Sequence, residues 1–150
     1  MTANAWQVYD VFLAQLGNEL HDLNATDTLK IALLDSGATP ASATDVTFTT
    51  VDADELTTAN GYTAGGDTVA ATYATSAGVL TLDVADASWT ASGGSITARY
   101  AVLWNSSAGG TNDLIAYCLL DNTPADVTAT DGNTFTVAIH ASGVFTATQA

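Results

Sequence analysis

The chain has almost no positive charge. Lys30 and Arg99 are its only lysine and arginine, against 16 aspartates and glutamates, and the formal net charge is −14. A surface of this kind repels DNA and anionic membranes and favours cations or basic protein surfaces. We therefore expect neither a nucleic acid nor a membrane among the partners of this protein.

Cysteine and long apolar runs are equally scarce. Cys118 is the single cysteine, so no intrachain disulfide can form, and its apolar neighbours over 114–120 predict a buried, unreactive thiol. The first ten residues lack the basic and apolar regions of a signal peptide. No segment approaches the roughly 18 apolar residues of a membrane span. We expect a protein made and folded in a cytoplasm, with one domain over residues 1–150.

Apolar residues recur at helical spacing near the N-terminus. They fall three and four positions apart over about 5–23, which gathers them on one face of an expected helix. Asn4 is a candidate cap for its start, and Gly17 weakens its last turn. A stripe this dense must be covered by a sheet or by a neighbouring subunit. The stripe consists of Trp6, Tyr9, Phe12, Leu13, Leu16 and Leu20.

The rest of the chain, from 28 to 148, reads as strands separated by turn signals. Over 96–104 we expect one long strand with Ile96, Ala98, Tyr100, Val102 and Trp104 on a single face. Residues 38–58 lack periodicity and predict a long surface excursion. The fold class is mainly β (α+β): an antiparallel β-sandwich or small barrel of about seven to eight strands with one N-terminal helix. The expected strands are 28–34, 68–74, 79–84, 96–104, 114–120, 134–139 and 144–148.

No pattern in the sequence indicates catalysis. His21 and His140 lie outside any metal-ligand or general-base spacing, so we interpret both as structural. Asp52, Asp54 and Glu55 form the one acidic cluster that could hold Ca²⁺ weakly, but the run lacks the glycine and the spaced glutamate of an EF-hand loop. A solvated loop is the favoured reading. We expect no catalytic residue and no cofactor.

Four residues are candidates for a protein interface. Trp6 and Tyr9 lie on the apolar stripe of the expected helix. Trp89 stands between small polar residues before Gly93, and is the aromatic that we most expect to be exposed. Arg99 offers a rigid fork for carboxylates, either within the chain, which we favour, or across a subunit interface. Replacing Arg99 by methionine is expected to impair folding or assembly.

An ordered set of motifs along the chain resembles a family of small structural proteins of tailed bacteriophages. The motifs are a short helix, LKIALL (29–34), NGYTAGGDT (60–68), SWT (88–90), ITARYAVL (96–103) and a late apolar strand. The resemblance implies that Gly61, Tyr62, Gly65, Gly66, Arg99 and Tyr100 belong to the scaffold of the fold. The scarcity of lysine departs from the family and indicates a high-salt setting, where charges are strongly screened.

The resemblance implies a virion protein without enzymatic activity, produced in the cytoplasm of a bacterial host. Its most specific form is a decoration, or cement, protein that binds the outside of the capsid shell and stabilises it. The partners would then be the major capsid protein and further copies of the chain, with a trimer as one arrangement. The alternative is a structural subunit of the tail, neck or fibre base. A glycan-binding or hydrolytic module on the particle surface, using Trp89 and the acidic cluster, ranks third.

Overall fold

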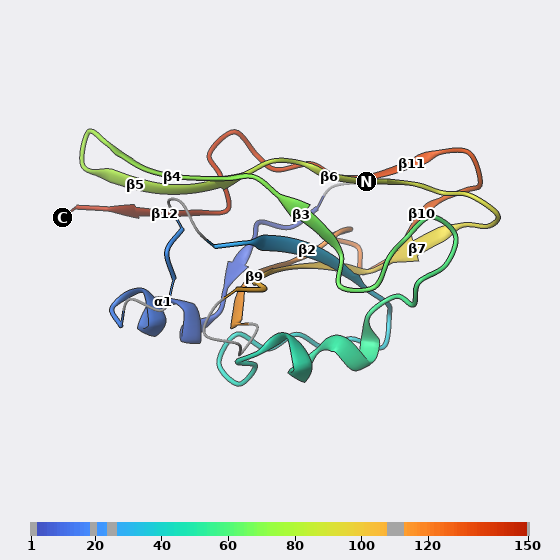
Figure 1. Ribbon diagram of the computed structural model, residues 1–150, viewed down its shortest axis with the longest axis horizontal. Coiled ribbons are helices and arrows are strands. Elements are labelled where there is room, and N and C mark those ends of the chain that lie inside the picture. The colour runs from blue at the N-terminus through green and yellow to red at the C-terminus, as the bar shows by residue number, and fades with distance from the viewer. Residues whose placement is uncertain (1–2, 19–20, 24–26, 108–112, 150) are drawn as a thin grey trace.

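The computed structural model describes residues 3–18, 21–23, 27–107 and 113–149 and is mainly β, with antiparallel sheets and an α-helix near the N-terminus (Figure 1). Expected strands 68–74 and 96–104 are each divided in two, and three short strands were not expected, which raises the strand number above the predicted seven or eight. The helical elements are α1 (Asp10–Leu16) and the 3-10 turns η1 (Phe48–Thr50) and η2 (Asp52–Asp54). The strands are β1 (Gln7–Val8), β2 (Leu29–Leu34), β3 (Asp67–Val69), β4 (Ala71–Ser76), β5 (Val79–Val84), β6 (Ala87–Thr90), β7 (Ile96–Ala98), β8 (Tyr100–Asn105), β9 (Asp113–Leu119), β10 (Val127–Ala129), β11 (Thr134–Val137) and β12 (Phe145–Thr148).

A five-stranded antiparallel sheet forms the middle of the molecule. Its order is β1-β9-β8-β2-β3, and β8 pairs with β2 over its whole length, from Leu29 opposite Asn105 to Leu34 opposite Tyr100. Nearly every residue of β2, β8 and β9 is buried. A strand that is apolar at successive positions must be covered on both faces. The strand expected over 114–120 is therefore confirmed, and as β9 it lies inside the sheet between β1 and β8.

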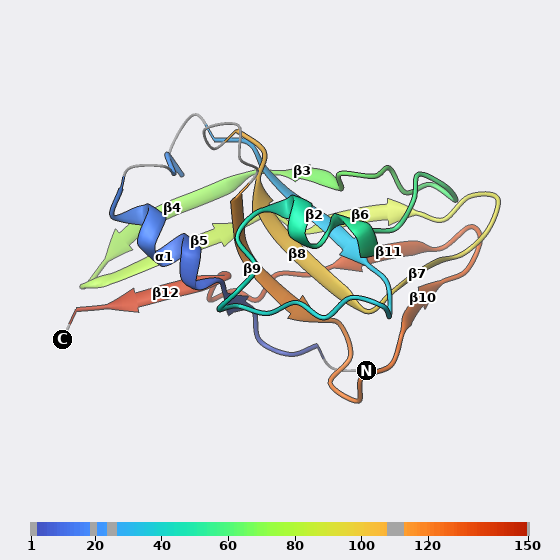
Figure 2. The same ribbon diagram turned by 90° about the horizontal axis from the view of Figure 1, so that it is seen from below.

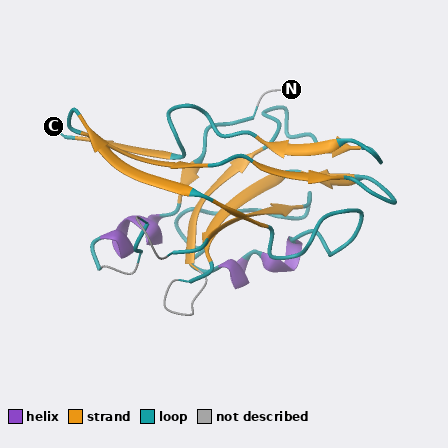
Figure 3. Ribbon diagram, turned by 45° about the horizontal axis from the view of Figure 1, so that its top comes forward, coloured by secondary structure: helices purple, strands orange, loops and turns teal. Residues whose placement is uncertain are grey.

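A second layer of strands lies over one face of this sheet (Figures 1 and 3). It contains the sheet β12-β5-β4 and the pair β11-β6, and β6 follows β5 directly along the chain. The main core fills the space between the layers and includes Phe12, Leu82, Trp89, Leu103 and Phe135. The architecture is therefore sandwich-like, as the alternation of the strands predicts.

A smaller core lies on the opposite face of the five-stranded sheet. Phe48 stacks on Trp104 with ring centroids 4.3 Å apart and planes 8° from parallel. Ala38 and Val51 are buried in the same cluster. The segment that carries η1 and η2 crosses the outer face of β2 and β8 (Figure 2). The segment 38–58 lies on the surface as expected, but Ala38, Phe48 and Val51 are buried because they cover a sheet that would otherwise expose apolar side chains.

The expected helix over 5–23 is wrong in its bounds. The α-helix spans Asp10–Leu16, and the residues before it extend along β9, where the Asn4 amide donates to the Leu119 carbonyl over 2.9 Å and Gln7 lies opposite Tyr117. Pairing with a distant strand outweighs the local helical spacing here. Residues 19–20, within the expected helix, lie outside the described residues. None of the helices in the described part of the chain has the length and hydropathy of a bilayer span.

The strand expected over 96–104 is interrupted at Arg99. The Arg99 amide donates to the Leu34 carbonyl and its carbonyl accepts from the Leu120 amide, both over 2.9 Å. The interruption changes the alternation, so the prediction of one shared face is wrong. Ile96 and Ala98 belong to the main core, whereas Tyr100, Val102 and Trp104 face the smaller one.

Candidate functional site

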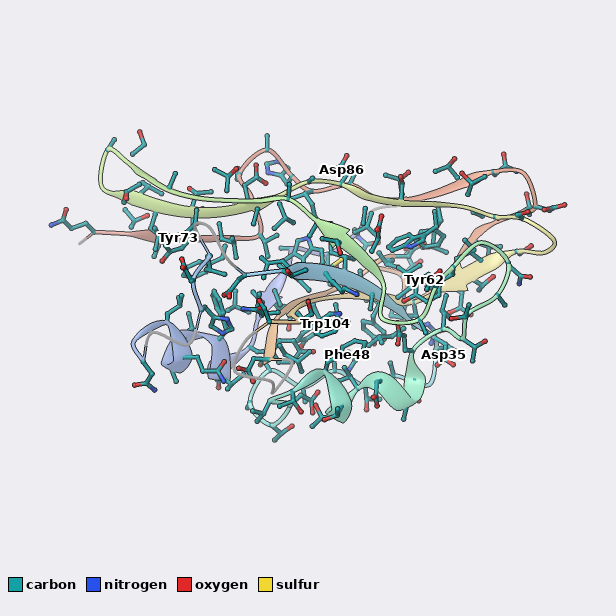
Figure 4. The ribbon with its side chains drawn as sticks, in the orientation of Figure 1. Asp35, Phe48, Tyr62, Tyr73, Asp86 and Trp104 are labelled. Carbon is teal, nitrogen blue, oxygen red and sulfur yellow. The ribbon has the colours of Figure 1, made fainter. Side chains whose placement is uncertain are left out.

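The glycine-rich turn over 60–67 connects β2 to the end of η2 through hydrogen bonds. The Tyr62 hydroxyl donates to Oε1 of Glu55 over 2.6 Å and accepts from the Leu33 amide over 3.1 Å. The Gly65 amide donates to the same Glu55 oxygen over 2.6 Å. Tyr62 is 2 % exposed and lies between the two layers (Figure 4). These hydrogen bonds hold the turn to β2 and to the end of η2. They use the Tyr62 hydroxyl both as a donor and as an acceptor.

The acidic cluster does not converge on a common point. Asp52 and Asp54 lie in η2, while Glu55 is turned to Tyr62 and Gly65. Burial raises the pKa of the Glu55 carboxyl, and its hydrogen bonds from Tyr62 and Gly65 partly oppose that rise. Across the described ranges, no group of three histidine, cysteine, aspartate or glutamate side chains is placed to hold a metal ion. The geometry thus gives no support to the weak Ca²⁺ hypothesis.

His21 belongs to a polar cluster at the end of β8. Its Nδ1 lies 3.0 Å from Nδ2 of the buried Asn105, and its Nε2 lies 3.0 Å from Oε1 of Gln15. Burial lowers the pKa of His21, although Asp113 and Asp27 oppose the shift. Both ring nitrogens are engaged, which agrees with a structural role. Cys118 is buried as well, and burial raises the pKa of its thiol to about 12.

The aromatic interface candidates differ in exposure. Trp89, expected to be exposed, is only 7 % exposed and contacts the rings of Tyr62 and Phe135, so that expectation is wrong. Its strand β6 faces the core at alternate positions, a pattern that the small polar neighbours concealed. Tyr9 is fully buried and packs on Tyr117, with ring centroids 5.1 Å apart. Trp6 is half-buried beside the main core and keeps part of its surface accessible.

Arg99 pairs within the chain. Its Nη2 lies 2.9 Å from Oδ1 of Asp126, and its Nε donates to the same oxygen over 2.9 Å. The two side chains are 26 % and 38 % exposed, so solvent screens the pair. The backbone of Arg99, by contrast, bonds to Leu34 and Leu120 whatever its side chain.

Arg99→Met is accordingly expected to lower the free energy of unfolding by less than about 1 kcal/mol, because a partly exposed pair contributes little. Urea denaturation of the parent and the variant measures this difference. Asp126→Asn should cost a similar amount, and the double variant should cost little more than either single one. A loss above about 2 kcal/mol for Arg99→Met would show that the side chain stabilises the interruption between β7 and β8.

An accessible feature with little charge is a three-stranded arm. Strands β4, β5 and β12 extend past the five-stranded sheet, with α1 on one side of them (Figure 1). Tyr73, Leu82 and Phe145 lie opposite one another on the face toward α1, where Phe145 meets Phe12 edge-on at 5.9 Å. Asp83 is the single charged residue in these three strands.

The outer edge of β4 is open. Within the described residues β4 pairs with β5 alone, and its sequence ATYATS contains neither charge nor proline. The hairpin turn at Ala77 and Gly78 has positive φ at both residues, as in a type I′ turn. Ser76 and Val79 then form a hydrogen-bonded pair, so the amides of Tyr73 and Thr75 point outward.

Proteins usually protect such edges with charges, prolines or bulges. An unprotected one is suited to pairing with a strand of another chain.

The excess of negative charge predicts a strong dependence of stability on salt. Lowering NaCl from about 0.5 M to about 0.01 M lengthens the Debye screening distance from about 4 Å to about 30 Å. Repulsion among the carboxylates should then lower the melting temperature by about 4 °C or more. Differential scanning calorimetry measures the shift. CaCl₂ at matched ionic strength is the control for ion binding at Asp52, Asp54 and Glu55, and a melting temperature insensitive to NaCl contradicts the prediction.

Comparison of the chain with protein-family models, with curated proteins and with solved structures gave no match. The resemblance to phage structural proteins therefore remains an interpretation of the sequence motifs.

Proposed function

We propose that the chain is a non-enzymatic structural protein of a tailed-phage virion, and specifically a decoration protein that binds the outside of the capsid shell. The observation that carries this proposal is the uncharged edge of β4, unpaired within the described residues, in a chain of formal charge −14. An edge of this kind adds to a sheet of a neighbouring protein through main-chain hydrogen bonds. The order of the sequence motifs, which resembles that of phage structural proteins, is the reason for placing the protein in a virion.

The distribution of charge favours attachment to protein over attachment to the genome. A chain with 16 acidic residues repels packaged DNA, while the uncharged edge of β4 can approach a capsid subunit without adding a carboxylate of its own to the contact. Repetition over a shell makes weak contacts effective when several copies are linked to one another. The partners in this proposal are the major capsid protein and further copies of the chain.

Binding to isolated shells tests the proposed contact. Capsids that lack the protein are mixed with recombinant chain and sedimented, and the bound fraction is measured. Thr75→Pro removes an outward amide of β4 while keeping its bonds to β5, and should weaken binding by about tenfold or more. Thr75→Val is the matched control, because it keeps the amide and favours strand structure. Equal binding by Thr75→Pro and Thr75→Val would exclude the β4 edge as the contact.

Electron cryomicroscopy of purified particles tests the location. The proposal expects density for the chain in many copies over the outer shell. Density confined to one vertex, in multiples of three or six copies, would replace the decoration function with the tail or neck alternative.

A further inference from the structure

The sandwich is closed along one side and open along the other. On the closed side the chain from β3 to β4 belongs to both layers, since β3 pairs with β2 and β4 pairs with β5. On the other side β1 is the edge strand of the five-stranded sheet. In the second layer, β11 and β12 are edge strands, each paired with one strand among the described residues. A cavity of about 780 Å³ lies there, lined by residues 3–6 and by 135–140 and 142–144 among others. Its size falls within the range of pockets that hold small organic ligands.

The interior of this cavity is apolar and largely aliphatic. Its deepest walls are side chains of the main core, each less than a tenth exposed. Trp6 contributes a half-buried ring from the N-terminal segment. None of the sixteen lining residues is aspartate, glutamate, lysine or arginine, although the chain contains 16 acidic residues. The buried lining residues are Cys118, Leu120, Phe135, Val137 and Val144.

The wall formed by 138–144 is held in place on both sides. The Ile139 amide donates to Oδ1 of Asp86 over 2.8 Å, and the Val144 amide donates to the Leu82 carbonyl over 2.9 Å. Side chains thus line a fixed opening instead of closing it. Buried apolar walls of this kind can accept the apolar part of a ligand.

Polar residues are found in the exposed part of the lining. Asn4, His140 and Ser142 are exposed and uncharged or weakly basic. The Ser142 amide donates to Nδ1 of His140 over 3.1 Å, so in the neutral ring the proton is on Nε2, which becomes a hydrogen-bond donor. These lining residues therefore offer donors and acceptors to a polar head group, and none of the described lining side chains is a lysine or an arginine that could pair with a carboxylate or a phosphate.

We propose that this cavity binds a neutral single-chain amphiphile, with its aliphatic chain between the two layers and a hydroxyl or amide head group at Asn4, His140 and Ser142. An anionic head group is disfavoured, because the lining contains no lysine or arginine and the protein has a net charge of −14. This site is separate from the β4 edge and does not depend on the proposed virion function.

Calorimetric titration with 1-octanol and with octanoate at pH 8 tests the proposal. The parent protein should bind octanol at least about tenfold more tightly than octanoate, whose chain has the same length. Ala5→Trp and Ala138→Trp add bulk at two exposed lining positions on opposite walls, and each should weaken octanol binding by about tenfold or more. Ala74→Trp, at an exposed position of β4 outside the cavity, is the matched control and should bind octanol like the parent.

Circular dichroism and thermal melting establish that each variant is folded before titration. Weakened binding in either folded cavity variant, with binding kept in Ala74→Trp, supports the site. Absence of octanol binding to the parent, equal affinity for octanoate, or unchanged affinity in both cavity variants would overturn it.

Discussion

Gly66→Ala is expected to lower the free energy of unfolding by about 3–5 kcal/mol, a large effect for a single methyl group. Gly66 has φ +75°, and a Cβ built on it overlaps the Ile31 carbonyl oxygen and lies 2.7 Å from Cα of Ala32. Both obstacles are backbone atoms of β2, which is held between β3 and β8 and cannot move aside. The cost therefore combines an unfavourable backbone conformation with a collision that does not relax.

Gly93→Ala and Gly132→Ala are the matched controls for this substitution. Their φ angles are +79° and +82°, but a Cβ at either position meets nothing within 4 Å. Each should cost about 1–2 kcal/mol, the penalty of the left-handed conformation alone. Urea denaturation followed by tryptophan fluorescence measures all three. If Gly66→Ala costs no more than Gly93→Ala, the close approach of the turn to β2 does not constrain the fold.

Tyr62→Phe is expected to cost about 2–3 kcal/mol at pH 7. The change leaves the Leu33 amide in the core without an acceptor and removes a donor from the half-buried carboxylate of Glu55. An unpaired buried donor alone costs about 1–3 kcal/mol. Tyr73→Phe on the arm is the matched control, since the Tyr73 hydroxyl makes no hydrogen bond to the described residues. It should change stability by less than about 0.5 kcal/mol.

The cost of Tyr62→Phe should also depend on pH. In the folded parent, burial raises the pKa of Glu55, and the hydrogen bond from Tyr62 opposes that rise. Without the hydroxyl, the folded-state pKa rises further, so stability is lost as pH increases from the ordinary glutamate range through the raised pKa. The variant should therefore lose less relative to the parent at pH 4 than at pH 7. Equal losses at both values would show that the Glu55 carboxylate does not depend on Tyr62.

Local patterns predict strands best where the partner strand is adjacent in sequence. The strand expected over 79–84 is observed as Val79–Val84, because the turn at Ala77 and Gly78 fixes its register with β4. The helix over 5–23 fails for the opposite reason. Its first residues pair with β9, more than 100 positions away, and no pattern within the segment reveals that partner. The interruption at Arg99 is likewise set by hydrogen bonds to Leu34 and Leu120.

The candidate sites likewise divide into features that the sequence predicts and features that depend on distant parts of the chain. Intramolecular pairing of Arg99 with an aspartate follows from the scarcity of cations, and Asp126 is that partner. The burial of Trp89 depends on Tyr62 and Phe135, which flank it from different parts of the chain. The open edge of β4 could have been suspected from its uncharged sequence, but its position at the end of a sheet follows only from the topology.

The pairing of β1 with β9 has a consequence for biosynthesis. Strand β1 is synthesised before β9, which is its sole partner among the described strands and ends at Leu119. Strand β1 must therefore remain unpaired until the more than 100 residues up to the end of β9 have been synthesised. The rate at which this edge of the sheet closes is governed by the search between distant chain segments, as in other β-proteins of high contact order.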